Sequence, residues 1–164
     1  MSVNYAQTDA ARLVDNHLEA VYRYARRLAA SVADAEDLTQ QVFLTAAERC
    51  DQLREPDRAR AWLFAILRTH FLRDRRRWLP ATATACGYDL STVPDEPDRA
   101  VIDADGLQQA LAELTEMHRL ILAMFYYEHK SYREIATDLD LPIGTVMSRL
   151  ARAKAQLRAR LFEQ

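Results

Sequence analysis

The sequence predicts an all-α protein in which two small helical domains are joined by a flexible acidic linker. Apolar residues recur at helical spacing over long stretches, whereas no pair of alternating apolar runs is joined by a hairpin dipeptide. Glycine is also scarce, with three residues in a chain of 164. Hydrophobic residues make up 49% of the chain, which is enough to form a core in each of two domains. We therefore expect helices and no strand.

The predicted N-terminal domain covers residues 8–78 and contains three helices, each with one apolar face. The first helix is expected to end near residues 30–32. The second is expected to begin at Asp34 as its N-cap, with Asp37 in the first turn, where an acidic side chain complements the helix dipole. The third is expected to begin at Pro56, because the fixed φ of proline suits the first turn of a helix.

The end of the third predicted helix is strongly basic. Residues 68–77 contain five arginines and one aspartate. Cations are favoured at the C-terminal end of a helix dipole, and one interpretation is a solvated helix end. Five arginines in ten residues exceed what capping requires, however, so the pattern favours contact with the phosphates of a nucleic acid.

Residues 79–106 are predicted to be a linker between the two domains. They contain three of the five prolines and two of the three glycines, and they show little periodicity. Their charge is acidic, with six Asp or Glu residues against Arg99 alone. A solubilising spacer is one interpretation of this segment. A connector of this length with no structure of its own is often functional, however.

The predicted C-terminal domain covers residues 107–162 and contains four helices, of which the last two form a helix-turn-helix. The first two are expected at residues 107–114 and 115–127. Ser131 and Glu134 have the spacing of a capping box at the start of the next helix. Asp140 stands where a tight turn needs a residue that tolerates the left-handed conformation. Pro142 suits the first position of the last helix.

The last helix is predicted to have a buried stripe and a basic outer side. The stripe consists of Val146, Leu150, Ala153, Leu157 and Leu161. Ser148, Arg149 and Arg152 fall on other sides of the helix. Residues 143–162 include five basic residues and no acid. A solvated surface is the simpler interpretation of such arginines, but their combination with the capping box and the proline favours DNA binding.

Composition limits the remaining function classes. The formal net charge is −2, so the chain alone gains little non-specific affinity for DNA and is expected to need a partner there. Cys50 and Cys86 have no neighbouring ligand at metal-binding spacing, so the sequence predicts no metal, disulfide or cofactor. The N-terminus is too polar for a signal peptide, and no apolar run approaches the roughly eighteen residues that span a bilayer. We expect a cytoplasmic protein that is not an enzyme.

Three segments of this chain together resemble the extracytoplasmic-function (ECF) sigma factors of bacterial RNA polymerase. Residues 34–43, DAEDLTQQVF, are similar to the signature of the family's helix that docks on the polymerase clamp. Residues 60–64, RAWLF, with the arginines that follow, are similar to the segment that opens the minus-ten element. Residues 132–152 match the helix-turn-helix that reads the minus-thirty-five element. The resemblance extends over nearly the whole chain.

The resemblance implies a sigma factor that directs promoter-specific initiation, and it assigns three groups of residues. Polymerase binding falls to Asp34, Asp37, Leu38, Gln40 and Gln41. Minus-ten recognition and melting fall to Arg68, Thr69, Arg73, Arg75, Arg76 and Arg77. Minus-thirty-five recognition falls to Thr145, Met147, Ser148, Arg149, Ala151 and Arg152. The implied partners are the largest-subunit clamp and the flap of core RNA polymerase, promoter DNA and an anti-sigma factor.

Three positions depart from the family pattern. The family often has Glu where Gln41 stands, Asn where Thr69 stands, and Lys or Arg where Met147 stands. Gln41 keeps its hydrogen-bonding capacity but lacks the charge. Thr69 is shorter than Asn and changes the contact that the amide would make. Met147 cannot pair with phosphate or guanine, which predicts a different promoter preference.

Two other classes of protein remain as alternatives. One is a stand-alone helix-turn-helix repressor or activator, which would bind its operator as a dimer without polymerase. The other is a protein-interaction module that sequesters another regulator, although this leaves the arginine-bearing helix without a role.

Overall fold

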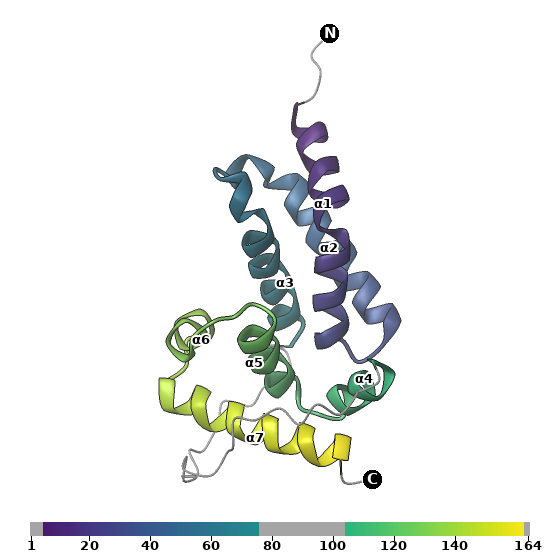
Figure 1. The fold of residues 1–164 in the computed structure, drawn as a ribbon. Helices are drawn as coiled ribbons and strands as arrows, with labels where there is room; N and C mark the ends of the chain where they lie inside the picture. Colours follow the sequence, from purple (N-terminus) through teal and green to yellow (C-terminus); the bar gives the residue numbers. More distant parts are fainter. Residues whose placement is uncertain (1–4, 76–103, 163–164) are drawn as a thin grey trace. The chain divides into compact units, whose positions relative to one another are not determined.

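The computed structural model describes residues 5–75 and 104–162, and all regular structure in these ranges is helical (Figure 1). They contain seven α-helices and two short 3-10 helices, and no strand occurs among them. The chain divides into two compact units, with the boundary between residues 80 and 81. The predicted all-α class is confirmed. Most of the predicted acidic linker lies outside the described residues.

The first unit is a three-helix bundle of α1 (Tyr5–Leu28), α2 (Val32–Glu48) and α3 (Ala59–Arg75), in which each helix contacts the other two. The Tyr24 and Phe64 rings meet edge to face, with centroids 4.8 Å apart. Thr45 Oγ1 lies 2.8 Å from His70 Nε2 and links α2 to α3. The fully buried residues at its centre include Val21, Tyr24, Leu28, Val42, Leu63 and Leu67.

The start of α2 differs from the sequence prediction. The N-cap is Ser31, not Asp34, and α1 ends at Leu28. The Ser31 hydroxyl accepts a hydrogen bond from the Asp34 N–H at 3.1 Å and donates one to Asp34 Oδ2 at 2.7 Å. Asp34 therefore lies inside the first turn, where its charge still complements the helix dipole. A serine hydroxyl three residues upstream satisfies the free N–H as well as an aspartate would, so residue type alone did not place this boundary.

The connection between α2 and α3 contains two 3-10 helices, Cys50–Gln52 and Pro56–Arg58. Pro56 was expected to open the third α-helix, but it opens the second 3-10 helix, and α3 begins three residues later at Ala59. The fixed φ of proline is compatible with either kind of first turn.

The second unit consists of α4 (Ala104–Ala112), α5 (Glu116–Tyr126), α6 (Tyr132–Leu139) and α7 (Ile143–Phe162). The long helix α7 contacts each of the other three. The core of the second unit includes Leu120, Ile121, Met124, Ile135, Val146, Leu150 and Ala153. Helix α4 begins at Ala104, so the last three residues assigned to the linker are helical. Its first turn contains Asp105, which complements the dipole and was expected in the linker.

The turn between α6 and α7 has the geometry that the sequence predicts. Both halves of the capping box are present, since the Ser131 hydroxyl accepts from the Glu134 N–H and the Glu134 carboxylate accepts from the Ser131 N–H at 2.8 Å. Asp140 has φ 52° and ψ 50°, in the left-handed region. The Leu141 N–H donates to the Ala136 carbonyl at 2.9 Å. Pro142 directly precedes the first residue of α7, and its carbonyl accepts from the Val146 N–H at 3.2 Å.

Among the described helices, none has the length and apolarity required to cross a membrane.

We expect Ser131→Ala to destabilise the second unit by about 1 kcal/mol, because it removes an N-cap and half of a capping box. Urea unfolding followed by circular dichroism, with hydrogen exchange at the α6 amides, measures this loss. Thr137→Ala is the control, since the exposed Thr137 hydroxyl donates only to the Arg133 carbonyl of its own helix, at 3.0 Å. Equal stability of the two variants would contradict a role for the cap.

The contribution of the capping box is also expected to depend on pH. Hydrogen bonds from the side chain and the backbone of Ser131 hold the pKa of Glu134 below its ordinary value, and Lys130 adds to the shift. A lowered folded-state pKa stabilises the fold above the unfolded value of about 4.3, and this stabilisation is lost as the pH falls through the folded value. The difference in unfolding free energy between the parent and Ser131→Ala should therefore shrink in acid. A difference that is constant between pH 7 and pH 3 would contradict this assignment.

Candidate nucleic-acid interface and docking surface

Helix α7 presents its predicted recognition residues at the surface of the second unit. Val146, Leu150 and Ala153 are at most 2% exposed and fix the inner side of the helix. The six predicted minus-thirty-five residues are each partly exposed: Thr145, Met147, Ser148, Arg149, Ala151 and Arg152. The Ser148 hydroxyl donates to the Thr145 carbonyl at 3.1 Å, so its oxygen remains able to accept from a ligand.

Arg149 and Arg152 form one edge of α7, which we call the basic edge. This edge lies near His118 of α5. His118 Nδ1 lies 3.0 Å from Gln156 Oε1, so that nitrogen carries the proton that the amide oxygen accepts. Burial lowers the pKa of His118, and the positive charges of Arg149 and Arg152 lower it further, against the opposing effect of Gln156. His118 was given no role from the sequence. It lies more than thirty residues from these arginines along the chain, and no local pattern joins them.

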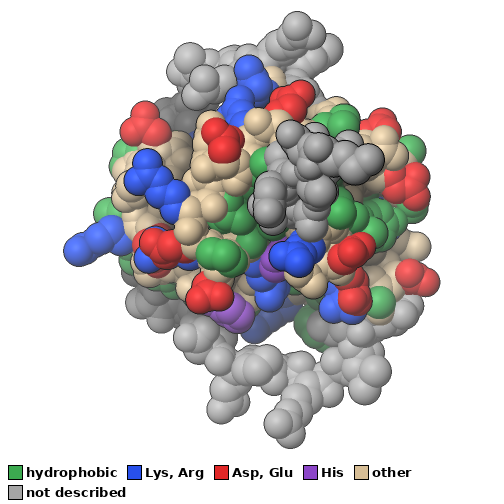
Figure 2. All heavy atoms as spheres, turned by 90° about the horizontal axis from the view of Figure 1, so that it is seen from above, with side chains coloured by type: hydrophobic (Ala, Val, Ile, Leu, Met, Phe, Trp, Pro, Cys, Tyr) green, Lys and Arg blue, Asp and Glu red, His purple; other side chains and the backbone are tan. Residues whose placement is uncertain are grey.

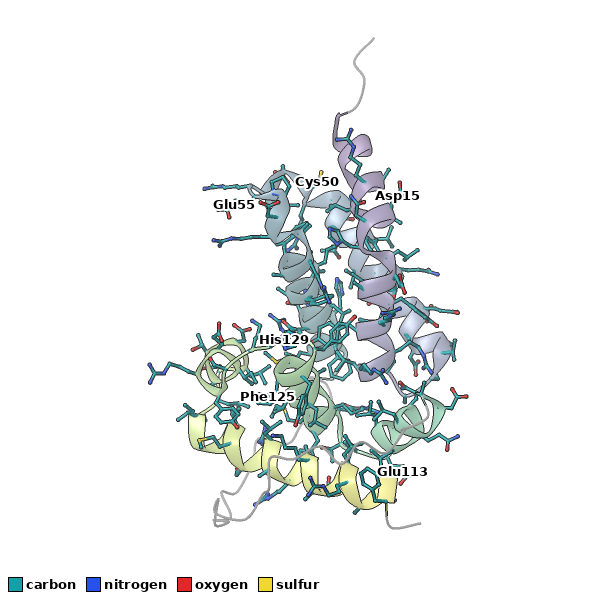
Figure 3. The ribbon with its side chains drawn as sticks, viewed as in Figure 1. Asp15, Cys50, Glu55, Glu113, Phe125 and His129 are labelled. Carbon is teal, nitrogen blue, oxygen red and sulfur yellow. The ribbon has the colours of Figure 1, made fainter. Side chains whose placement is uncertain are left out.

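Lys154 and Arg160 of α7 interact with side chains of the second unit. The Lys154 ammonium lies 4.9 Å from the centre of the Phe125 ring and 5.3 Å from that of Tyr126, in cation–π geometry. Arg160 forms an ion pair with Glu113. Figure 3 shows Phe125 on α5 facing α7, and Glu113 near the C-terminal end of α7. These two side chains thus have contacts within the protein that a nucleic acid would have to compete with.

The outer face of α2 in the first unit contains predicted docking residues and the exposed side chain of Leu44. Four of the predicted docking residues are exposed, namely Asp34, Asp37, Gln40 and Gln41. Leu38 is only 6% exposed and belongs to the core of the bundle, so its side chain does not form part of the surface. Leu44 is 66% exposed and falls on the same side of the helix as Gln40 and Gln41. We refer to Asp37, Gln40, Gln41 and Leu44 as the α2 docking face.

The arginine-rich end of α3 is only partly at the surface. Arg68 is 8% exposed, so it lies within the bundle and not on the predicted DNA-contacting side. Thr69 is exposed and its hydroxyl donates to the Ala65 carbonyl at 2.9 Å. Arg73 is exposed. The other minus-ten candidates lie outside the description: the side chain of Arg75, and Arg76 and Arg77 altogether.

Charges of both signs occur on the described surface. Acidic and basic side chains are interspersed across the face seen in Figure 2, in keeping with the net charge of −2. Within residues 5–75 and 104–162, no group of three or more His, Cys, Asp or Glu side chains is placed to hold a metal ion.

Comparison with family models places both units in the sigma-70 class. The model of sigma-70 region 2 matches residues 13–78, which include most of α1 and all of α2 and α3. The model of sigma-70, region 4 matches residues 104–157, which include α4 to α6 and most of α7.

Curated relatives identify the family within the sigma-70 class to which this chain belongs. The ECF RNA polymerase sigma factor SigL of Mycobacterium tuberculosis is 36% identical over 156 residues, which are 92% of this chain and 88% of that protein. The ECF sigma factor SigE of Mycolicibacterium smegmatis is 36% identical over 152 residues, 89% of this chain and 59% of that protein. The chain therefore belongs to the ECF sigma factors. It binds core RNA polymerase and directs promoter-specific initiation of transcription.

Solved structures support the fold. The sigma factor RpoE of Bartonella quintana, in complex with the anti-sigma factor NepR, aligns with a TM-score of 0.65 and 24% identity over 92% of this chain and 95% of that one. CnrH, in complex with the cytosolic domain of CnrY, aligns with a TM-score of 0.57 and 26% identity over 97% and 96% of the two chains.

We expect the double variant Arg149→Ala, Arg152→Ala to change promoter selection, measured with the reconstituted holoenzyme on duplexes randomised in the minus-thirty-five element. Loss of a base-reading arginine should cost about 1–3 kcal/mol and relax the preference at one position. Loss of a phosphate contact should weaken all sequences alike and reduce the salt slope by about one. Arg158→Ala is the control, because this exposed arginine lies two turns nearer the C-terminus of α7. If the double variant selected the same promoter sequences as the parent, and with the same strength, Arg149 and Arg152 would not belong to the promoter interface.

Proposed function

We propose that the two units divide the work of promoter recognition between the α2 docking face and helix α7. The observation that carries this proposal is that one chain contains both features: an exposed polar face on α2 of the first unit, and a helix-turn-helix with a capping box at the start of α6 in the second. The proposed N-terminal domain is residues 8–78 and the C-terminal domain is residues 107–162, extended to the start of α4 at Ala104. Residues 79–103 then form the connecting linker.

The α2 docking face is proposed to bind the clamp of the largest polymerase subunit. Asp37, Gln40 and Gln41 supply hydrogen-bonding groups around the exposed Leu44 side chain. An apolar residue with a polar rim is the usual composition of a protein–protein interface. Because Val42 and Leu38 hold the opposite side of the helix in the core, substitutions on the docking face should leave the bundle folded.

Helix α7 is proposed to lie in the major groove at the minus-thirty-five element. Burial of Val146, Leu150 and Ala153 turns the other sides of the helix outward. The first turns carry Met147, Ser148 and Ala151 beside the basic edge. A helix of this kind reads base edges with its N-terminal residues and positions itself through phosphate contacts.

Minus-ten recognition is proposed for the end of α3, with Thr69 and Arg73 as its described surface residues. Arg68 is left out because its side chain is buried. The remaining arginines of the run, Arg75 to Arg77, are proposed to follow the phosphates of the opened strand. Unstacking a base costs a few kcal/mol, so a site that holds the single strand shifts that equilibrium toward the open complex.

An anti-sigma factor is a further proposed partner. The solved relative CnrH is in complex with the cytosolic domain of CnrY. A regulator that covered the α2 docking face or α7 would block polymerase or promoter by direct competition.

Action with RNA polymerase also supports a cytoplasmic location and a non-enzymatic role, in which polymerase performs the chemistry. Transcription with core polymerase on a promoter library tests these assignments together, and operator binding by the free chain as a dimer would favour a stand-alone repressor or activator instead.

We expect the double variant Asp37→Ala, Gln40→Ala to bind core polymerase about tenfold more weakly, equivalent to about 1.4 kcal/mol, because it removes two polar groups of the docking face. Fluorescence anisotropy with labelled sigma factor measures affinity, and circular dichroism verifies helicity.

The matched control is Asp15→Ala, Asn16→Ala, which removes one carboxylate and one amide from exposed positions of α1. The affinity of this control should equal that of the parent. Equal affinities for both double variants would exclude the α2 docking face from the polymerase interface.

A further inference from the structure

Helix α7 has an apolar edge opposite its basic one. Ile143, Met147 and Ala151 are spaced four residues apart, so they lie along one line on the helix surface. Ile143 is 46% exposed, and Met147 and Ala151 are partly exposed. We call these three residues the apolar edge. On the other side of the outward-facing Ser148 lie Arg149 and Arg152.

The apolar edge lies beside the fully buried stripe of α7 and is not part of it. The inner side of α7 is already formed by Val146, Leu150 and Ala153, each at most 2% exposed. Met147 follows Val146 by one residue and is therefore turned by about 100° from it around the helix axis. Its side chain lies off the core stripe, on the flank of the outward face.

The neighbouring position on this edge is small. Ala151 lies one turn after Met147, so a flexible thioether side chain is followed by a single methyl group. Neither residue has a donor for guanine or phosphate. Polar contacts on this helix come instead from Ser148 and from the arginines of the basic edge.

The major groove offers one apolar group that such side chains can contact. Each thymine presents its C5-methyl there, whereas the other base edges present hydrogen-bond donors and acceptors. Alanine and similar apolar side chains recognise this methyl by van der Waals contact, and methionine adapts its shape to irregular apolar surfaces. An apolar edge on a groove-facing helix therefore matches thymine and disfavours bases that leave a polar group unpaired against it.

We propose that Met147, supported by Ala151, reads the C5-methyl group of a thymine in the minus-thirty-five element. The basic edge of α7 supplies the phosphate and guanine contacts on the other side of Ser148. This inference rests on the proposed position of α7 in the major groove and deepens it by naming the group that Met147 recognises. The preferred element of this sigma factor then contains a thymine at the position that faces Met147.

The test starts from a promoter selected by the parent holoenzyme from duplexes randomised in the minus-thirty-five element. Each thymine in that element, on either strand, is replaced singly by deoxyuridine, which keeps the O4 acceptor and the base pairing but lacks the methyl. We expect one of these replacements to lower initiation by roughly fourfold, the effect of one methyl-sized group removed from an apolar contact. Replacements elsewhere in the element should change initiation little.

Variants of Met147 connect this loss to the side chain. Met147→Gln has a similar length and helix propensity but a polar end, and it should initiate equally from the thymine and deoxyuridine templates. Met147→Leu remains apolar and should keep most of the discrimination. Arg158→Gln, an exposed position farther along α7, is the control and should discriminate as the parent does. Circular dichroism verifies that each variant is folded.

Three results would overturn the methyl contact: a selected element without thymine, equal initiation by the parent on every deoxyuridine template, or undiminished discrimination by Met147→Gln. Failure of the underlying proposal has a different signature. If scrambling the whole minus-thirty-five element left initiation by the parent unchanged, α7 would not read promoter DNA at all. Normal dependence on the element without dependence on the methyl would refute only the role of Met147.

Discussion

Burial of one apolar stripe fixes the rotation of each long helix about its axis, and in this sigma factor that rotation decides which residues face a partner. In α7 the stripe of Val146, Leu150 and Ala153 is almost fully buried, which turns the serine, the arginines and the apolar edge outward. In α2, Leu38 and Val42 occupy the same role and leave the docking face exposed. A slip of one residue would rotate either helix by about 100° and remove its functional residues from the surface.

Local hydrogen bonds place the ends of these helices. Ser31 caps α2, and the capping box of Ser131 with Glu134 starts α6. The left-handed Asp140 then reverses the chain so that only three residues lie between the end of α6 and the start of α7. A β-branched or bulky residue would be strained at that position. The presentation of α7 thus depends on a short turn in which the Asp140 and Leu141 N–H groups donate to carbonyls of α6.

The distribution of charge is consistent with a subunit that needs polymerase to hold it on DNA. The net charge is −2, and Lys154 and Arg160 interact with aromatic and acidic neighbours within the second unit. The proposed interface on α7 has a narrow basic edge formed by Arg149 and Arg152. Such an edge contributes orientation and sequence preference more than bulk affinity, since non-specific attraction to DNA grows with the number of phosphates neutralised. In the proposed function, polymerase adds a second contact that raises the effective concentration of α7 at the promoter.

The sequence by itself determined the all-α class, the capping box, the left-handed turn at Asp140 and the buried stripe of α7, because each depends on residues within a few positions of one another. It also carried the family motifs on which the assignment of function first stood. Only the tertiary structure showed that Arg68 and Leu38 are buried, that Leu44 is exposed on α2, and that His118 lies beside the arginines of α7. Burial and charge proximity depend on how helices distant in sequence pack together, and no local period encodes that packing.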